Sequence, residues 1–442
     1  MKKTYLKRLE LKEYRAFKEF AIDFIDSNVI IILGINGKGK SSILDSIAYN
    51  LSFFVSKMYA LNLDEIVYES QPVFEDVNLD AESALSTLKF YSFDNEISIS
   101  TYLNKVETKP EYSYEPKEFI DNFRKFISTY KQEGLPIFAY YRSHRSKVNP
   151  DHSSFKGTYD SRLFGNHRAF RKEFSSFTGF ESWYSAVHEK VVGGSANSTL
   201  EYVNQAILTF LSSFTQVEFT QVRVVTARVK SGYKYDNFRI QILKTNQWIN
   251  LRSLSSGEKS LIYLVCDIAR RLSISNDYKS TSLQGNGIII IDEIELHLHP
   301  SWQRNILSSL SKVFPNIQFV VTTHSPFVVN SIDDAAIYEV NSNKTNGEIE
   351  INKFTSSTSN SISYVLEKVF EVHEEFGNKT QLLLDKFYDY RNEVLENNDE
   401  NAELLLEIAK KLRETANYEI IDRVNFEINQ IYKRTDDEKY RF

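Results

Sequence analysis

Apolar residues recur along the chain in two patterns, one typical of buried strands and one typical of helices. Asn28–Leu33 carries β-branched residues at consecutive positions, as a strand buried on both faces does. Gly34–Ser41 interrupts this run, and Ser42–Lys57 resumes with apolar residues at helical spacing. Further apolar runs follow at Gly287–Ile291 and Ile317–Thr323, with helical stretches between them. Strands that alternate with helices predict an α/β fold with a parallel or mixed core sheet.

Other segments predict additions to this core. Strand patterns at Tyr5–Leu11 and Val217–Leu251 lead us to expect an antiparallel β subdomain. Residues 145–216 are expected to form a helical insertion. Residues 361–442 combine helical spacing with 12 Lys or Arg against 19 Asp or Glu and contain no proline. We therefore expect one domain over residues 1–360, followed by an acidic helical region that serves oligomerisation or partner binding.

Composition narrows the class of protein. The formal net charge of −6 argues against a chain that coats nucleic acid indiscriminately. The single cysteine excludes an intramolecular disulfide, which suits a reducing compartment. No apolar run reaches the roughly 18 residues that a membrane-spanning helix requires. We therefore expect a cytoplasmic protein without a membrane partner.

The glycine-rich interruption fits the phosphate-binding pattern G-x-x-x-x-G-K-[ST]. Its position between a buried strand and a helix allows successive backbone N–H groups to surround phosphate beside a helix N-terminus. The lysine would reach the β- and γ-phosphates, and the hydroxyl that follows it would ligate Mg²⁺. The expected nucleotide-binding residues of this loop are Asn36, Gly37, Gly39, Lys40, Ser41 and Ser42.

A second strand ends in two carboxylates, as the other half of a phosphoryl-transfer site does. Asp292 follows the run Ile288–Ile291 and would help Ser41 to hold Mg²⁺. Glu293 is placed to polarise the attacking water as a general base. His324 follows the next apolar strand and could donate a hydrogen bond to the γ-phosphate. Glu293 and His324 are therefore the expected catalytic residues.

The string Leu254–Glu258 opens a helix, where a serine hydroxyl and a glycine amide form an anion-binding end. A chain with one complete phosphate loop does not need a second such end at the same site. We therefore expect Ser255, Gly257 and Glu258 to contact the γ-phosphate held by another subunit, which predicts a homodimer or a higher homo-oligomer.

The order and spacing of these motifs resemble the ABC ATPase superfamily, and within it the RecF/SMC-like branch. In that resemblance Gly34–Ser41 matches the Walker A motif, Leu254–Glu258 the signature motif, and Asp292 with Glu293 the Walker B motif. It implies ATP and Mg²⁺ as ligands. His324 matches the switch histidine, and the opening TYLKRLELKEYRAFKEF implies that Arg15 lies near the nucleotide.

Three local features refine the resemblance. LPIFAYYRSHR and the region of Trp183 are similar to bacterial AAA-type ATPases of phage-defence operons, most of all the Septu and retron-associated ATPases of the PtuA type. His299 stands where the D-loop usually has an aspartate, and no Q-loop glutamine is found near Ser143–Arg145. Nothing after residue 340 reads as a Toprim nuclease site, so no nuclease site is expected in this chain.

Together these expectations describe an ATPase of an anti-phage system that dimerises through composite nucleotide sites and regulates a partner nuclease of the HNH type or another effector. Two alternatives stay open, a DNA-repair or DNA-clamping ATPase and a slow-hydrolysing nucleotide sensor. Residues 142–172 and 223–252 are rich in lysine and arginine, and each region could contact DNA.

Overall fold

The fold is described from a computed structural model. The residues it describes are 4–35, 37–60, 70–106, 109–118, 134–143, 161–170, 184, 187–188, 199–214, 219–226, 238–276, 282–342, 349–360, 362–370, 377–395, 401–415 and 418–435. The chain divides into two compact units, Met1–Ile362 and Ser363–Phe442.

A six-stranded sheet forms the centre of the described part of the first unit. In sheet order its strands are β14 (Ile349–Thr355), β13 (Ala336–Ser342), β3 (Val29–Leu33), β12 (Ile317–Thr322), β11 (Gly287–Ile291) and β7 (Ile137–Tyr141). All neighbours run parallel except β13 and β14. Every residue of β3, β7, β11 and β12 is buried, as expected for central strands of a largely parallel sheet, and Gln318 and Thr322 of β12 are buried polar exceptions in these largely apolar strands.

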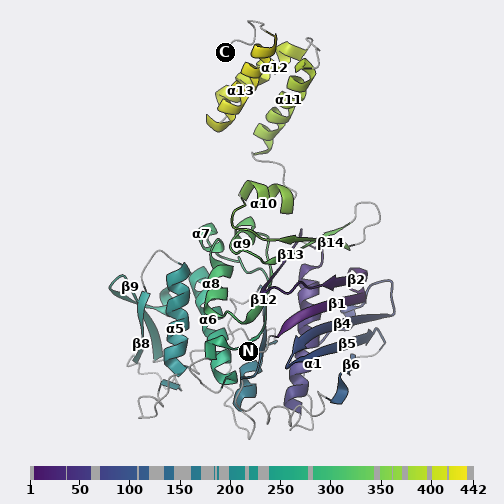
Figure 1. Ribbon diagram of the computed structural model, residues 1–442, viewed down its shortest axis with the longest axis vertical. Helices are drawn as coiled ribbons and strands as arrows, with labels where there is room; N and C mark the ends of the chain where they lie inside the picture. Colours follow the sequence, from purple (N-terminus) through teal and green to yellow (C-terminus); the bar gives the residue numbers. More distant parts are fainter. Residues whose placement is uncertain are drawn as a thin grey trace. The chain divides into compact units, whose positions relative to one another are not determined.

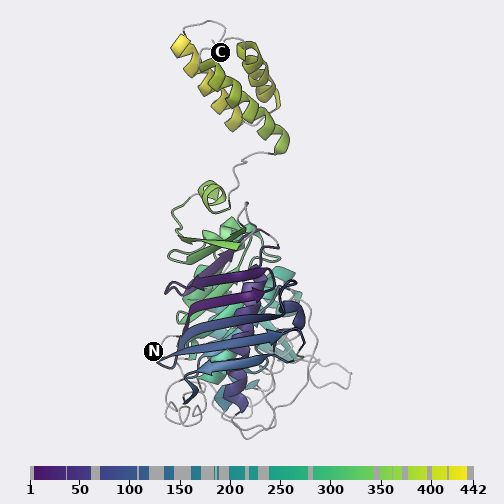
Figure 2. The ribbon, with the colours of Figure 1, turned by 90° about the vertical axis from the view of Figure 1, so that its right-hand side faces the viewer.

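An antiparallel sheet covers α1 (Lys40–Ala60) from the other side, and Figure 2 shows its strands in front of that helix. In sheet order the strands are β2 (Phe17–Asp23), β1 (Tyr5–Tyr14), β4 (Ser83–Ser92), β5 (Asn95–Asn104) and β6 (Glu111–Glu115). Strand β4 alternates strictly between buried and half-buried residues, as expected for a sheet with one face on a helix. Helix α1 contacts both sheets.

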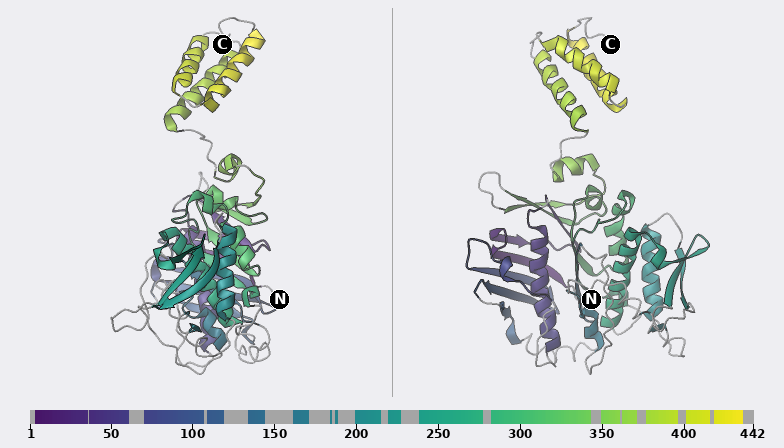
Figure 3. Two further views of the ribbon diagram at one scale, coloured as in Figure 1. Left: turned by 90° about the vertical axis from the view of Figure 1, so that its left-hand side faces the viewer. Right: turned by 180° about the vertical axis from the view of Figure 1, so that it is seen from behind.

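Helices and a third sheet complete the first unit on the other flank of the core (Figures 1 and 3). The helices are α5 (Thr199–Phe214), α6 (Ser256–Ser275), α7 (Pro300–Gln303), α8 (Ile306–Val313) and α9 (Pro326–Val329), with short 3-10 helices at Ser161–Asn166, Leu251–Ser253 and Ser282–Gln284. A further 3-10 helix, Phe74–Asp76, lies instead beside the turn between β1 and β2. The third sheet has the order β10 (Gln247–Asn250), β9 (Phe238–Lys244), β8 (Phe219–Thr226), and all its strands are antiparallel.

The second unit is helical. Helix α10 (Ile362–Val369) precedes α11 (Asn378–Leu395), α12 (Ala402–Thr415) and α13 (Tyr418–Thr435). The last three helices share a core that includes Phe387, Leu405 and Ile428. An ion pair of 2.7 Å between Arg391 and Glu427 joins α11 to α13. Among the described residues, no helix is both long and apolar enough to cross a membrane.

The expected α/β fold with a mixed core sheet and antiparallel β structure is confirmed. The five-stranded antiparallel sheet also contains β4, β5 and β6, within residues 83–115, which were not among the expected strands. The helical structure expected between Gly287–Ile291 and Ile317–Thr323 consists of two separate helices, α7 and α8. Most of the expected helical insertion at residues 145–216 lies outside the described residues, which include α5 and the short helix at Ser161–Asn166 within that range.

Candidate functional site

The glycine loop joins β3 to α1, and its backbone adopts conformations that favour glycine. Gly37 has φ = 82° and Gly39 has φ = 94°, both in the left-handed region. A Cβ atom on Gly39 would lie 2.6 Å from the ring of Phe17, so the loop packs directly against β2. The loop therefore lies between the two sheets and ends at the N-terminus of α1. Asn36, also expected in the site, lies outside the described residues.

Lys40 begins α1 and is almost fully buried, with 6% of its surface exposed. Its Nζ donates hydrogen bonds to the carbonyl oxygens of Gly34 at 2.7 Å and of Ile35 at 3.1 Å. Burial lowers the pKa of Lys40, while the carboxylates that follow β11 oppose that shift. A buried ammonium held by carbonyls of its own loop is placed to exchange them for the charged oxygens of a phosphate.

Ser41 and Asp292 bring a hydroxyl and a carboxylate together from different elements. The Ser41 Oγ lies 3.3 Å from Oδ1 and 3.2 Å from Oδ2 of Asp292, to which it donates. Asp292 is buried at the end of β11, and its backbone N–H donates to the carbonyl of Tyr141 on the neighbouring β7. Hydroxyl and carboxylate oxygens are the hard ligands that Mg²⁺ takes beside a phosphate. The two residues therefore fit a magnesium site.

A threonine on the neighbouring strand connects the two acidic residues. The Oγ1 of Thr322, the last residue of β12, donates to Asp292 Oδ1 at 2.6 Å and accepts the backbone N–H of Glu293 at 2.8 Å. Glu293 has φ = 48°, which is uncommon for a residue with a side chain. The chain thus turns sharply after Asp292, and Thr322 holds both sides of the turn.

His324 follows β12 and is held by its backbone. Its N–H donates to Glu295 Oε1 at 2.5 Å. Burial lowers the pKa of the His324 imidazole, and the positive charge of Lys40 adds to the shift. The imidazole is therefore neutral at neutral pH, with one ring nitrogen able to donate and the other able to accept.

Arg15 lies in the turn between β1 and β2 and reaches the first turns of α1. Its Nη1 donates to Ser42 Oγ at 3.1 Å, and its Nη2 lies 2.9 Å from Asp45 Oδ2. The Nε donates to Asp76 Oδ1 at 2.6 Å, while Arg142 at the end of β7 donates to Asp45 Oδ1 at 2.5 Å. The structure thus brings Arg15 and Ser42 together beside the glycine loop in a half-buried network of two arginines and two aspartates.

The signature residues Ser255 and Glu258 form a capping box at the start of α6. Ser255 Oγ accepts the backbone N–H of Glu258 at 3.3 Å and donates to Glu258 Oε2 at 2.8 Å. Gly257 lies against the turn after β11, because a Cβ atom there would be 2.4 Å from the carbonyl oxygen of His297. The start of α6 therefore rests on the segment that follows Glu293.

That segment is also tied to the end of β12. Gln303 on α7 donates through Nε2 to the carbonyl of Leu298 at 2.9 Å and accepts at Oε1 from Ser325 Oγ at 2.5 Å. His299 caps α7, with Nδ1 accepting the N–H of Ser301 at 3.3 Å. Among the described residues there is no cluster of three or more side chains suited to a metal.

Sequence reasoning missed several supporting residues of this site. They are Asp45, Asp76, Glu295, Gln303 and Thr322. Only Thr322 carried a usable signal, since a polar residue at the end of an apolar strand beside β11 must lie near Asp292. The other contacts join residues far apart in the sequence or depend on a turn whose shape the pattern does not give.

Comparisons with known proteins agree with this geometry. Residues 29–330 match the protein family described as "AAA domain, putative AbiEii toxin, Type IV TA system". The chain is 28% identical to the "Retron Vc95 probable ATPase" of Vibrio cholerae serotype O1 biovar El Tor, over 77% of this chain and 74% of that one. It is 26% identical to the "Retron Ec83 probable ATPase" of Escherichia coli, over 82% and 76% of the two chains.

It is also 24% identical to the "Septu protein PtuA" of Bacillus thuringiensis, over 76% of this chain and 74% of that protein. The resemblance to Septu and retron-associated ATPases is thereby confirmed. Because the matched family covers well over half of the chain and includes the glycine loop, the start of α6 and the ends of β11 and β12, this protein belongs to the AAA-domain family of that description.

Proposed function

We propose that this chain is an ATPase of a bacterial anti-phage system, which dimerises through composite nucleotide sites and regulates a partner effector. The observation that carries the enzymatic part is the meeting of Ser41, Asp292 and Thr322 at the ends of α1, β11 and β12. The defence context rests on the names of the relatives, which are retron ATPases and a Septu protein.

Within one subunit the roles follow from position. The backbone of Gly37 and Gly39 and the ammonium of Lys40 bind the phosphates of ATP, while Ser41 and Asp292 hold Mg²⁺. The metal, when bound, neutralises charge on the phosphates during transfer. Glu293 takes a proton from the attacking water. His324, whose imidazole pKa is lowered by burial, contacts the γ-phosphate.

The second half of each site comes from another subunit. The start of α6 presents Ser255 and the N–H groups of its first turn, an arrangement that binds anions. Because Gly257 touches the backbone of His297, a phosphate bound there presses on the segment after Glu293 of its own chain. Assembly and hydrolysis are coupled through this contact.

A partner supplies the effector activity, and an HNH-type nuclease is the proposed class. The second unit, Ser363–Phe442, is the proposed surface for assembly or for that partner. Leu382, Tyr418 and Phe426 expose 61%, 78% and 61% of their surface on its helices, which leaves apolar side chains available for contact with another chain.

The proposal is tested by light scattering on purified wild-type protein, Glu293→Gln and Lys40→Ala, each with and without Mg·ATP, together with a phosphate-release assay. Glu293→Gln should bind ATP and gain mass while releasing little phosphate. Lys40→Ala should neither bind ATP nor gain mass, and it should also release little phosphate. Wild-type protein that neither binds ATP nor releases phosphate would contradict the ATPase assignment. Nucleotide binding without any change of mass would contradict only the composite site.

A further inference from the structure

The third sheet has one face that packs inward and one that faces outward. Residues directly opposite each other in antiparallel strands share a face, so Val222 lies beside Ile242, and Val224 beside Ile240. Ile240 and Ile242 are fully buried, and β8 contacts α5. Figures 1 and 3 show β8 and β9 beyond α5, at the margin of the first unit.

The outward face has an unusual composition. By the same register it carries three amides, two arginines, one tryptophan and two aliphatic residues, namely Gln221, Arg223, Val225, Arg239, Gln241, Leu243, Trp248 and Asn250. None of these described positions is acidic. The surrounding sequence 223–252 has seven lysines and arginines against one acid, Asp236, in a chain whose overall charge is negative.

Arg223 and Trp248 form a stack that crosses the sheet. Their strands are separated by β9, yet the guanidinium carbon of Arg223 lies 3.8 Å from the centre of the Trp248 ring. The Arg223 Nε also donates to Gln241 Oε1 at 2.9 Å. Arg223 is exposed at the surface while held flat by these two contacts. The face therefore presents an ordered layer of planar groups with a positive charge.

We propose that this face binds single-stranded nucleic acid. Unpaired bases stack on aromatic rings and on guanidinium planes, amides donate and accept at base edges, and arginine attracts the phosphate backbone. Arg223 and Trp248 supply the stacking layer, and Gln221 and Gln241 lie beside it. A duplex keeps the faces of its bases stacked on one another and would leave the planar layer without a base to stack on.

The face is also connected to the nucleotide site. After β10 the chain forms the short helix Leu251–Ser253 and then reaches Ser255. On the inward side of the same sheet, Lys244 Nζ lies 4.0 Å from Oε1 of Glu258. A single-stranded nucleic acid bound across β8, β9 and β10 would therefore lie next to the first turn of α6, which carries Glu258.

The test measures binding of a fluorescent single-stranded DNA of about 16 nucleotides to the full chain. Fluorescence anisotropy is recorded in the absence of ATP at several salt concentrations. We expect Trp248→Ala to weaken binding about tenfold with little change in salt dependence, because it removes stacking and no charge. Arg223→Ala should weaken binding and reduce the slope of log affinity against log salt by about 0.7. Arg223→Lys should retain the slope and still bind more weakly.

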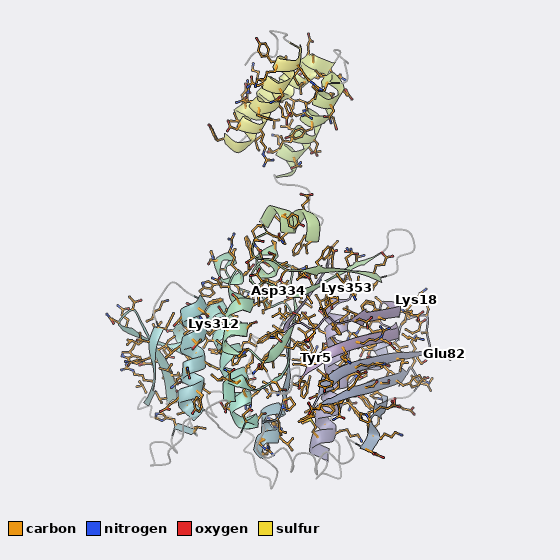
Figure 4. All side chains as sticks on the ribbon, viewed as in Figure 1. Tyr5, Lys18, Glu82, Lys312, Asp334 and Lys353 are labelled. Carbon is orange, nitrogen blue, oxygen red and sulfur yellow. The ribbon has the colours of Figure 1, made fainter. Side chains whose placement is uncertain are left out.

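Lys353→Ala is the matched control, since Lys353 is also an exposed cation above a ring, that of Tyr338, on the separate strand β14 (Figure 4). It should bind as wild type does. Thermal unfolding should show that each variant is folded. Failure of the wild-type chain to bind, equal binding by all variants, or tighter binding of the matching duplex would overturn the proposal. So would a change in oligomeric mass in Arg223→Ala with no oligonucleotide binding by wild type, which would identify a protein interface.

Because no ATP is added, this experiment does not depend on the proposed ATPase activity. Loss of DNA binding in Lys40→Ala is not expected, and that variant separates the two proposals.

Discussion

Thr322 and Asp292 are joined by a hydrogen bond of 2.6 Å between the threonine hydroxyl and the carboxylate at the end of the adjacent strand. The same hydroxyl accepts the N–H of Glu293. One side chain on β12 thus orients the proposed metal ligand and fixes the turn that carries the proposed general base. Neither role could be filled by the apolar residues Phe319, Val320 and Val321 that precede it in the strand.

Thr322→Val tests this arrangement, because valine keeps the shape and β-branching but removes the hydroxyl. Loss of a residue that orients a metal ligand typically costs about 10- to 100-fold in metal affinity or activity. We expect phosphate release to fall by that factor while ATP still binds. Thr323→Val is the control, since Thr323 is equally buried but its Oγ1 accepts only from Ser325 N among the contacts described. Similar rates for the two variants would remove Thr322 from the site.

A second buried carboxylate fixes α6 in place. Asp267 accepts from Arg271 Nε at 2.7 Å and from Tyr141 OH at 2.8 Å, while Arg270 donates to its other oxygen. Burial alone would raise the pKa of Asp267, but the charges of Arg271 and Arg270 outweigh it and hold the pKa below the usual range. Arg271 also donates to the carbonyl of Gly165 at 2.9 Å, which extends the network beyond α6.

Asp267→Asn should therefore destabilise the first unit by about 3–5 kcal/mol at neutral pH, as expected when a buried ion pair loses one partner. A carboxylate with a depressed pKa in the folded state stabilises fully above its unfolded pKa and loses that contribution as pH falls toward the folded pKa. The difference between wild type and variant should thus be constant above about pH 4 and shrink below it.

Urea unfolding followed by tryptophan fluorescence measures this difference in the first unit, because all three tryptophans precede residue 363. Glu96→Gln is the control. Its ion pair with Lys7 is about half exposed on both sides and screened by solvent, so its removal should change the free energy of unfolding little. A deficit in Asp267→Asn that grew on acidification would contradict the sign of the pKa shift.

The core of the fold could be predicted because buried parallel strands leave a simple signal. The residues of β3 and β11 are apolar without interruption, and the glycine loop and the acidic pair directly follow them. By contrast, β4 to β6 carry many serines, threonines and tyrosines, which obscure the alternation that the structure shows in β4. In a single sequence, a strand with many polar residues on its exposed face has a pattern that is hard to distinguish from that of a loop.

The residues of the candidate site also fall into those that local sequence patterns predict and those that they do not. Lys40, Ser41 and Asp292 belong to local motifs whose place on a strand or helix fixes their position. The contact of Arg15 with Asp76 joins residues 61 apart, and Asp76 enters the site only because the chain between them returns along β1. No local pattern encodes such a return. The fold, and not the spacing, brings these charges together.

The second unit offers a prediction about assembly. Phe426 is largely exposed on α13, where its neighbours Val424 and Ile428 are buried in the helical core. If this surface assembles the protein, Phe426→Ser should reduce the oligomeric mass seen by light scattering without unfolding the helices, which circular dichroism checks. Lys433→Ser, at another exposed position of α13, should leave the mass unchanged. Equal masses for wild type and Phe426→Ser would exclude this residue from the interface.

Gly257→Ala tests the proposed coupling between the start of α6 and the segment after Glu293. The added Cβ atom would lie 2.4 Å from the carbonyl oxygen of His297, so the two segments must move apart. We expect a loss of about 1–3 kcal/mol of stability, with ATP binding to the glycine loop retained and the gain of mass with Mg·ATP lost. Gly377→Ala is the control, because within the described part of the chain, its two chain neighbours aside, no atom lies within 4 Å of the position its Cβ would take.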